Sequence, residues 1–189
     1  MSSEERRASI LAATVPLLIE HGTDITTRQI ATAAGVAEGT IFRVFVDKET
    51  LIAAAVEQAF DPTPVEAELR AIDPTLELEV RCEAAVDIIQ SRVASLWRIL
   101  TAAGGYQSDD QRAKREDRRR STLRALASVF EPDRARLRLE PIEAADVLRR
   151  LIIANCHPAL TLGEPMSPQE IVSVILDGTR THADGQPAC

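Results

Sequence analysis

The side chains best suited to chemistry lie close together in the first third of the chain. Hydroxyl, basic and aromatic residues gather there: Thr27, Arg28, Thr40, Phe42, Arg43 and Lys48. Cations and hydroxyl groups can contact phosphates and base edges, and an arginine can donate two hydrogen bonds to one guanine. These side chains can act together only if the helices that hold them present them on one surface.

A short helix is expected to carry the first of these side chains. Thr26 and Gln29 have the spacing of a capping box, so a helix should begin at Thr27. Small and apolar residues follow at helical spacing, namely Ile30, Ala31 and Ala34. Gly35 should end this helix, because glycine takes the left-handed conformation without steric cost.

A second helix is expected from about Glu38 to Phe45. Ile41 and Phe45 would form its buried side and Val36 would anchor the turn before it. The outer side would then present Glu38, Thr40, Arg43 and part of Phe42. Two short helices that cross closely after a sharp turn form a helix-turn-helix.

This stretch resembles the DNA-binding domain of the TetR family of bacterial transcriptional repressors. The matching residues are Thr26-Thr27, Ile30-Ala31, Ala34-Gly35-Val36, Gly39-Thr40-Ile41-Phe42, Phe45, Asp47-Lys48-Glu49 and Leu51. The resemblance extends over residues 1–60, and the chain departs from the usual family pattern at Ala37, Glu38, Arg43 and Val44. It implies a homodimeric repressor that binds double-stranded, palindromic operator DNA and is released by a small-molecule effector.

The resemblance also assigns roles to the first set of residues. It implies that Thr27, Phe42 and Lys48 touch phosphates, whereas Arg28, Thr40 and Arg43 are better placed for base edges. Glu38 either accepts a hydrogen bond from a cytosine amino group or lies outside the groove, and we favour the second interpretation.

An effector cavity in the rest of the chain is a further implication of the resemblance. We expect a mostly apolar ligand, contacted by Cys82, Trp97, Arg98, Tyr106, Asn155 and His157. Each has a purely structural alternative: Trp97 can be plain core, and Asn155 and His157 can cap a helix end.

Composition is ordinary for a soluble globular protein, but the charge is acidic. The chain of 189 residues has 45% hydrophobic residues and a formal net charge of -7, and residues 1–60 carry five basic and eight acidic side chains. We therefore expect few ionic contacts to DNA and weak non-specific binding. The sequence has no long apolar run or signal peptide, so we expect a cytoplasmic protein.

The pattern predicts an all-α fold in two domains. A three-helix, helix-turn-helix DNA-binding domain is expected at 1–60, and a helical effector-binding and dimerisation domain at 61–189, after the Asp61-Pro62-Thr63-Pro64 stop. A long helix should begin at Asp73 and end at Gly104-Gly105. The helices at 142–156 and 167–182 have apolar residues around most of their circumference, which favours a homodimer through a four-helix interface.

Other functions are less well supported by the residues. Asn155-Cys156-His157 are neighbours on a helix and point in different directions, so we expect no enzymatic activity. The scattered cysteines and histidines have no metal-binding spacing, and no cofactor is expected. Two alternatives stay open: a regulator that senses thiol oxidation through Cys82 or Cys156, and a helical protein-interaction module that does not bind DNA.

Overall fold

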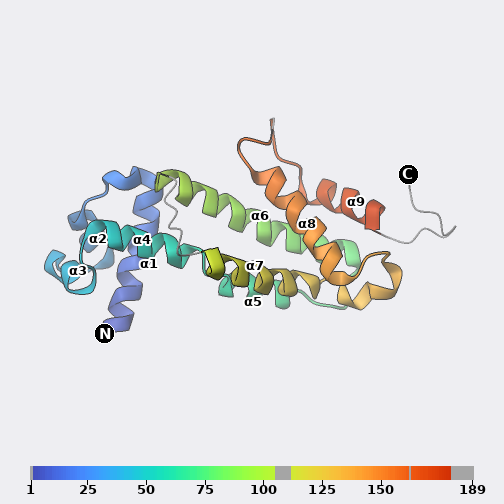
Figure 1. Cartoon of the computed structure of the whole chain (residues 1–189), viewed down its shortest axis with the longest axis horizontal. Helices are drawn as coiled ribbons and strands as arrows, with labels where there is room; N and C mark the ends of the chain where they lie inside the picture. The colour runs from blue at the N-terminus through green and yellow to red at the C-terminus, as the bar shows by residue number, and fades with distance from the viewer. Residues whose placement is uncertain (1, 105–111, 162, 180–189) are drawn as a thin grey trace. The chain divides into compact units, whose positions relative to one another are not determined.

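The computed structural model describes residues 2–104, 112–161 and 163–179, and these residues form helices and connecting segments (Figure 1). The elements are α1 (Ser3–His21), η1 (Gly22–Asp24), α2 (Thr27–Ala34), α3 (Glu38–Val44), α4 (Lys48–Ala59), α5 (Thr63–Arg70), α6 (Leu78–Ala102), α7 (Arg112–Ala127), η3 (Glu131–Arg136), α8 (Pro141–Cys156) and α9 (Pro168–Thr179). No β-strand occurs in the described ranges, which confirms the all-α fold class. No helix in them is long and apolar enough to cross a membrane.

The described residues fall into two compact units. Unit 1 holds those of Met1–Asp61 and Ser95–Asp109, and unit 2 holds those of Pro62–Ala94 and Asp110–Cys189. The long helix α6 therefore contributes its first turns to unit 2 and its last turns to unit 1.

Unit 1 is built around one apolar cluster contributed by α1 to α4 and the end of α6. Its fully buried members include Ile10, Leu18, Ile25, Ile30, Ile41 and Leu51, and α6 adds Ile99 and Ala103. Burying side chains of this size is the main favourable term in folding, at about 1.5 to 3 kcal/mol each. The cluster holds α2 and α3 against α1 and so fixes the helix-turn-helix.

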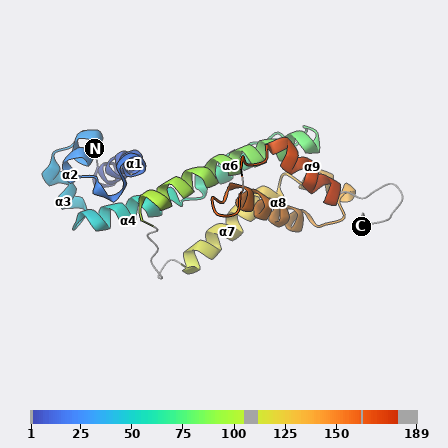
Figure 2. The same ribbon diagram turned by 90° about the horizontal axis from the view of Figure 1, so that it is seen from above.

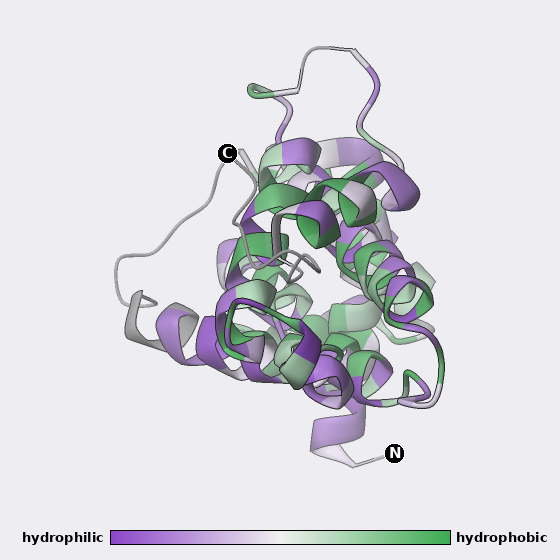
Figure 3. Ribbon diagram, turned by 90° about the vertical axis from the view of Figure 1, so that its right-hand side faces the viewer, coloured by the Kyte–Doolittle hydropathy of each residue, from purple (hydrophilic) through white to green (hydrophobic). Residues whose placement is uncertain are grey.

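Unit 2 has its own core, to which α5, the first part of α6, α7, α8 and α9 contribute. Large buried residues include Leu69, Leu78, Leu126, Phe130, Leu148, Ile152 and Ile175. Helix α8 packs against both α7 and α9 (Figure 2). Hydrophobic and hydrophilic segments alternate along the helices (Figure 3), as expected where each helix buries one side.

A buried arginine ties three segments of unit 2 together. Arg81 on α6 is 2% exposed, and its Nε donates to the Val129 carbonyl at 3.0 Å. Its guanidinium also donates to the Leu76 carbonyl and forms an ion pair with Asp133 in η3. A buried charge is costly unless it is paired and hydrogen-bonded, so these partners offset the cost of burying the Arg81 guanidinium.

The long helix α6 begins at Leu78, later than the start predicted at Asp73. The Asp73 carboxylate accepts a hydrogen bond from the Thr75 backbone N–H at 2.8 Å and another from the Thr75 hydroxyl at 2.7 Å. Aspartate that bonds to the backbone two residues on forms an Asx turn, which competes with a helical start. The turn therefore delays the helix.

The outer faces of α8 and α9 are mixed rather than apolar throughout. Ile142 and Val147 on α8 are 42% and 44% exposed, and Val174 on α9 is 55% exposed. Polar side chains lie beside them, namely Glu143 and Arg150 on α8 and Gln169, Glu170, Ser173 and Asp177 on α9. The sequence pattern overestimated the apolar surface of α9, because most of its aliphatic residues are used inside unit 2.

Candidate nucleic-acid interface

The start and end of α2 follow from local chemistry. The Thr26 hydroxyl accepts from the Gln29 backbone N–H at 3.2 Å, and the Gln29 side chain accepts from the Thr26 N–H at 2.8 Å. Gly35 closes the helix in the left-handed conformation, with φ of 67°. These observations confirm the predicted capping box and glycine stop, and they fix the angle at which the chain enters α3.

Helix α3 has a buried side and an outer side. Ile41 is fully buried and Phe45, which follows the helix, is 3% exposed, so these two hold α3 against the unit 1 core. On the outer side Phe42 is 53% exposed, Arg43 is exposed and Thr40 is half-buried. A large aromatic ring left half in solvent beside a cation is suited to contact with a partner.

A hydrogen bond between α2 and α3 joins two of the polar side chains considered for DNA contact. The Thr27 hydroxyl donates to Glu38 Oε1 at 2.6 Å. Thr27 is the first residue of α2 and Glu38 the first residue of α3. The two helix starts therefore lie side by side, and Glu38 is held beside α2 instead of extending freely into solvent.

The end of α3 is held by α1 through an aromatic contact. The Arg7 guanidinium carbon lies 4.6 Å from the centre of the Phe45 ring. A guanidinium over an aromatic face is attracted by about 0.5 to 1 kcal/mol where the site is exposed. Arg7 was not predicted, because nothing in the local sequence pattern links α1 to a residue 38 positions later.

Helix α4 begins beside η1. Asp47 caps it by accepting from the Thr50 backbone N–H at 2.7 Å. Hydrogen bonds from the Thr50 side chain and from its backbone N–H hold the pKa of Asp47 below its usual value. Lys48 is half-buried, and its ammonium donates to the Thr23 carbonyl at 3.0 Å. Arg28, in the first turn of α2, is exposed. All six residues predicted to contact DNA thus belong to α2, α3 or the first turn of α4.

The residues predicted for the effector are spread over both units. Cys82 is fully buried in the unit 2 core. Trp97 and Arg98 lie in the part of α6 that belongs to unit 1, whereas Asn155 and His157 lie in unit 2. Tyr106 is outside the described residues. The structure therefore does not bring these residues together in a single unit.

Asn155 and His157 both have structural partners. Asn155 Nδ2 donates to the Met166 carbonyl at 3.1 Å, and Asn155 Oδ1 accepts from the Met166 N–H at 2.8 Å. His157 Nδ1 accepts from the Ala159 N–H at 3.1 Å. These bonds give both side chains a structural role in the segment between α8 and α9, and none is the helix cap considered for these residues.

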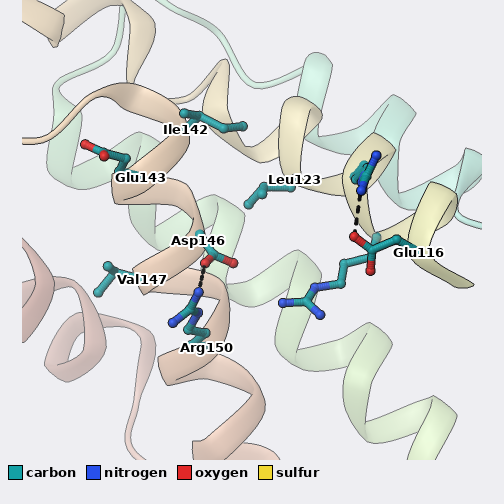
Figure 4. Close-up of a pocket in the computed structure, with 9 residues that line it drawn as sticks. Glu116, Leu123, Ile142, Glu143, Asp146, Val147 and Arg150 are labelled. Atoms are coloured by element: carbon teal, nitrogen blue, oxygen red, sulfur yellow. Dashed lines mark hydrogen bonds and ion pairs between the residues drawn. The ribbon is translucent and has the colours of Figure 1, made fainter.

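A groove in unit 2 lies between α7 and α8 (Figure 4). It has a volume of about 510 Å³, and none of the residues predicted for the effector lines it. Leu123 and Ile142 line it together with two ion pairs, Arg120 with Glu116 at 3.0 Å and Arg150 with Asp146. The groove is therefore lined by charges of both signs and by the apolar side chains of Leu123 and Ile142.

The cysteines differ in their surroundings. Cys82 is fully buried and Cys156 is half-buried, and burial raises the pKa of the Cys156 thiol. A raised pKa reduces the thiolate fraction, which is the form that reacts with oxidants. Cys189 is outside the described residues. Among the described residues no three His, Cys, Asp or Glu side chains are grouped to hold a metal ion.

Comparison with known proteins agrees with this geometry. Residues 10–55 match the family model described as bacterial regulatory proteins, tetR family. These residues include α2, α3 and the start of α4, which carry all six side chains predicted for DNA. No curated protein matches the chain.

Several solved structures have the same fold over nearly the whole chain. A TetR-family transcriptional regulator from Agrobacterium tumefaciens has 16% identity and a TM-score of 0.63, covering 95% of this chain and 100% of that one. The SmeT–triclosan complex has 20% identity and a TM-score of 0.60, covering 98% and 96%. NalD, the secondary repressor of the MexAB-OprM multidrug efflux pump in Pseudomonas aeruginosa, has 21% identity and a TM-score of 0.51, covering 94% of each chain.

The N-terminal match and the shared fold agree with the capped α2, the left-handed turn at Gly35 and the outward-facing side of α3. Residues 10–55 thus match the N-terminal domain of the tetR family of bacterial regulatory proteins, and the chain shares its fold with solved structures described as regulators of that family.

Proposed function

We propose that the protein is a repressor that binds a palindromic operator as a homodimer and is released by a small, mostly apolar effector. The observation that carries the proposal is the division of α3 into a buried side, with Ile41 and Phe45, and an outer side, with Phe42 and Arg43. In helix-turn-helix proteins the second helix enters the major groove, so its outer side must be free.

The proposed contacts with DNA are those that the family resemblance implies. Thr27, Phe42 and Lys48 hold phosphates, and Arg28, Thr40 and Arg43 face base edges. The acidic charge of the region limits the number of phosphate contacts, so the affinity should fall only moderately as salt increases. A titration of operator affinity against salt concentration tests this, and an affinity that does not change with salt would exclude phosphate contacts altogether.

Selection of bound duplexes from a random pool tests the DNA-binding proposal as a whole. A two-fold dimer should enrich a palindrome whose half-sites are separated by about one helical turn of DNA or a multiple of it. No enrichment of any sequence would contradict the proposal and would favour the helical interaction module instead.

Dimerisation is proposed through α8 and α9. Ile142, Val147 and Val174 expose large aliphatic side chains there, and the neighbouring charges are of both signs. The same face of α8 forms one wall of the groove with α7, so a partner subunit seated on α8 would also cover part of that groove. A mixed surface of this kind fits an interface with an apolar centre and a polar rim.

Sedimentation of two matched variants tests the dimer. Val147→Asp places a charge at the centre of the proposed interface and should shift the protein from dimer to monomer. Val80→Asp changes a residue of similar exposure on α6, 48% against 44%, and should leave the dimer intact. Equal behaviour of the two variants would place the interface elsewhere.

An effector is proposed because SmeT, which shares the fold, has been solved as a complex with triclosan. The core of unit 2 is aliphatic, which suits a ligand of similarly low polarity. Trp97 is the single tryptophan of the chain, so its fluorescence can report on binding. Lipophilic compounds should change this fluorescence and lower operator affinity together. Binding that leaves operator affinity unchanged would reject control by an effector.

The alternative of a thiol sensor has less support. Cys82 is fully buried, and the raised pKa of Cys156 works against a reactive thiolate. Mass spectrometry after mild oxidation distinguishes the two schemes, since a thiol sensor would show a modified Cys82 or Cys156 together with altered DNA binding.

A further inference from the structure

The carboxylate of Glu38 is fixed at the start of α3 by a neighbour from α2. Glu38 Oε1 accepts a hydrogen bond from the Thr27 hydroxyl at 2.6 Å. Glu38 is exposed and Thr27 is half-buried, so the bond lies at the surface of unit 1. A carboxylate has two acceptor oxygens, and within the described residues no hydrogen bond to Glu38 Oε2 is recorded.

The place of Glu38 on α3 is the place from which a helix-turn-helix reads bases. It is the first residue of the helix, and the N-terminal residues of the second helix contact base edges in the major groove. Phe42 lies one turn further on the same side of α3 and is 53% exposed. Glu38 therefore lies at the N-terminal end of the outer side of α3.

The bond also decides what Thr27 can do. A threonine hydroxyl has one hydrogen, so it cannot donate to Glu38 and to a phosphate at the same time. The backbone N–H of Thr27, in the first turn of α2, has no partner inside the helix and remains available to a phosphate. The side chain can then serve to orient Glu38 while the backbone contacts DNA.

We propose that Glu38 is a specificity-determining residue that accepts a hydrogen bond from a cytosine amino group, and that Thr27 is the positioning residue that orients it. Among the bases, cytosine offers a donor in the major groove without an adjoining acceptor, whereas guanine presents two acceptors that repel a carboxylate. The negative charge of Glu38 thus selects cytosine, because the carboxylate is tolerated only where the cytosine amino group faces it. The inference rests on the proposed DNA-binding function.

The bond to Thr27 favours a role for Glu38 inside the groove, whereas the interpretation from the sequence alone favoured a position outside it. That interpretation treated Glu38 as a free surface acid. The bond to Thr27 joins residues 11 positions apart and depends on how α2 and α3 cross, which no local pattern reveals.

Four proteins compared by selection from a random duplex pool test the proposal: the natural chain, Glu38→Gln, Thr27→Val and Thr27→Ser. The natural chain should enrich a palindrome with cytosine at one position of each half-site. Glu38→Gln keeps the size of the side chain but gains a donor, so the preference there should move to adenine or disappear, a change on the order of tenfold, while other positions are kept.

The Thr27 variants separate orientation from a merely structural role. Thr27→Val removes the hydroxyl at nearly constant shape and should weaken the preference at the same position only. Thr27→Ser restores the hydroxyl and should restore the preference. Thermal melting by circular dichroism, with equal midpoints for the four proteins, shows that a changed preference is not a consequence of unfolding.

The outcomes separate failure of the proposed role of Glu38 from failure of the proposed DNA binding. If the natural chain enriches a palindrome that Glu38→Gln also enriches unchanged, the role of Glu38 is overturned while DNA binding stands. An equal gain of affinity for all sequences in Glu38→Gln also overturns it, because Glu38 would then only repel phosphates. If the natural chain enriches nothing, the proposed function fails and this inference fails with it.

Discussion

The Lys48 ammonium donates a hydrogen bond to the backbone carbonyl of Thr23, with Nζ and the oxygen 3.0 Å apart. The bond joins the start of α4 to η1 and holds the ammonium in one place. An ammonium has three donors, so two remain for a phosphate. Lys48 is therefore a fixed point charge, which is suited to positioning DNA and carries no sequence information by itself.

Substitution of Lys48 and of Arg43 should have different consequences for DNA binding. Lys48→Ala should weaken binding to all sequences alike and lower the slope of affinity against salt by about one unit. Arg43→Ala should cost about 1 to 3 kcal/mol on the preferred sequence and relax the preference at one position. Anisotropy titrations with the preferred duplex and a scrambled one measure both effects.

Arg124→Ala is the control for these titrations, because Arg124 is an exposed arginine on α7 in unit 2. It should change neither affinity nor preference. If Arg43→Ala and Lys48→Ala affected the preferred and scrambled duplexes in the same way, the division between base reading and phosphate holding would be wrong.

Two glycines of the helix-turn-helix should respond to alanine with opposite signs. Gly35 has a φ of 67°, and a Cβ there meets no atom within 4 Å, so Gly35→Ala carries only the backbone strain of the left-handed conformation, about 1 to 2 kcal/mol. Gly39 lies inside α3 with equally open space, so Gly39→Ala should stabilise by about 0.5 to 1 kcal/mol. Urea unfolding measures both changes. A loss of stability in Gly39→Ala would contradict the helical conformation of Gly39 and the open space beside it.

The buried ion pair of unit 2 should be far more important for stability than an exposed one. Asp133→Ala leaves the Arg81 guanidinium, which is 2% exposed, without its carboxylate and should destabilise by about 3 to 5 kcal/mol. Arg134→Ala breaks pairs with Glu131 and Glu140 that are open to solvent, so it should change stability little. Equal costs in urea unfolding would mean that Asp133 does not compensate the buried charge.

The same carboxylate predicts how stability depends on pH. Burial tends to raise the pKa of Asp133, but hydrogen bonds and charges from Arg81 and Arg136 outweigh it, so the pKa lies below its usual value. A carboxyl group of this kind stabilises the fold above its unfolded pKa of about 3.9, and the stabilisation is lost as the pH falls through the folded pKa. The stability difference between the natural chain and Asp133→Asn should therefore be constant near neutral pH and shrink in acid.

Urea unfolding of both proteins at a series of pH values checks this. A difference that stayed constant down to strongly acidic pH, or grew there, would show that the Asp133 pKa is not lowered by the fold.

Features set by neighbours along the chain could be predicted from the sequence. The capping box of Thr26 and Gln29 and the glycine stop at Gly35 depend only on residues a few positions apart, and both are present. The cap of α9 by Ser167 and Glu170 is of the same kind. Apolar periodicity likewise predicted α8 and α9, because burial of one side is the main requirement for a helix in a folded domain.

Features set by tertiary packing could not be predicted. The bonds between Thr27 and Glu38 and between Lys48 and Thr23 join residues from different elements, so they depend on helix crossings. Ile99 and Ala103 pack in the unit 1 core, and nothing in the local pattern of the long helix shows which core its last turns join. The start of α6 was misplaced because the side chain of Asp73 stabilises a turn instead of a helix cap.

Photocrosslinking tests most directly whether the outer side of α3 contacts DNA. A photoreactive phenylalanine analogue replaces Phe42, which is 53% exposed and so tolerates the change, and in a control it replaces Gln58, exposed in the last turns of α4. With the preferred duplex, we predict a protein–DNA crosslink from position 42 and none from position 58. No crosslink from position 42 in a protein that still binds the duplex would contradict the account.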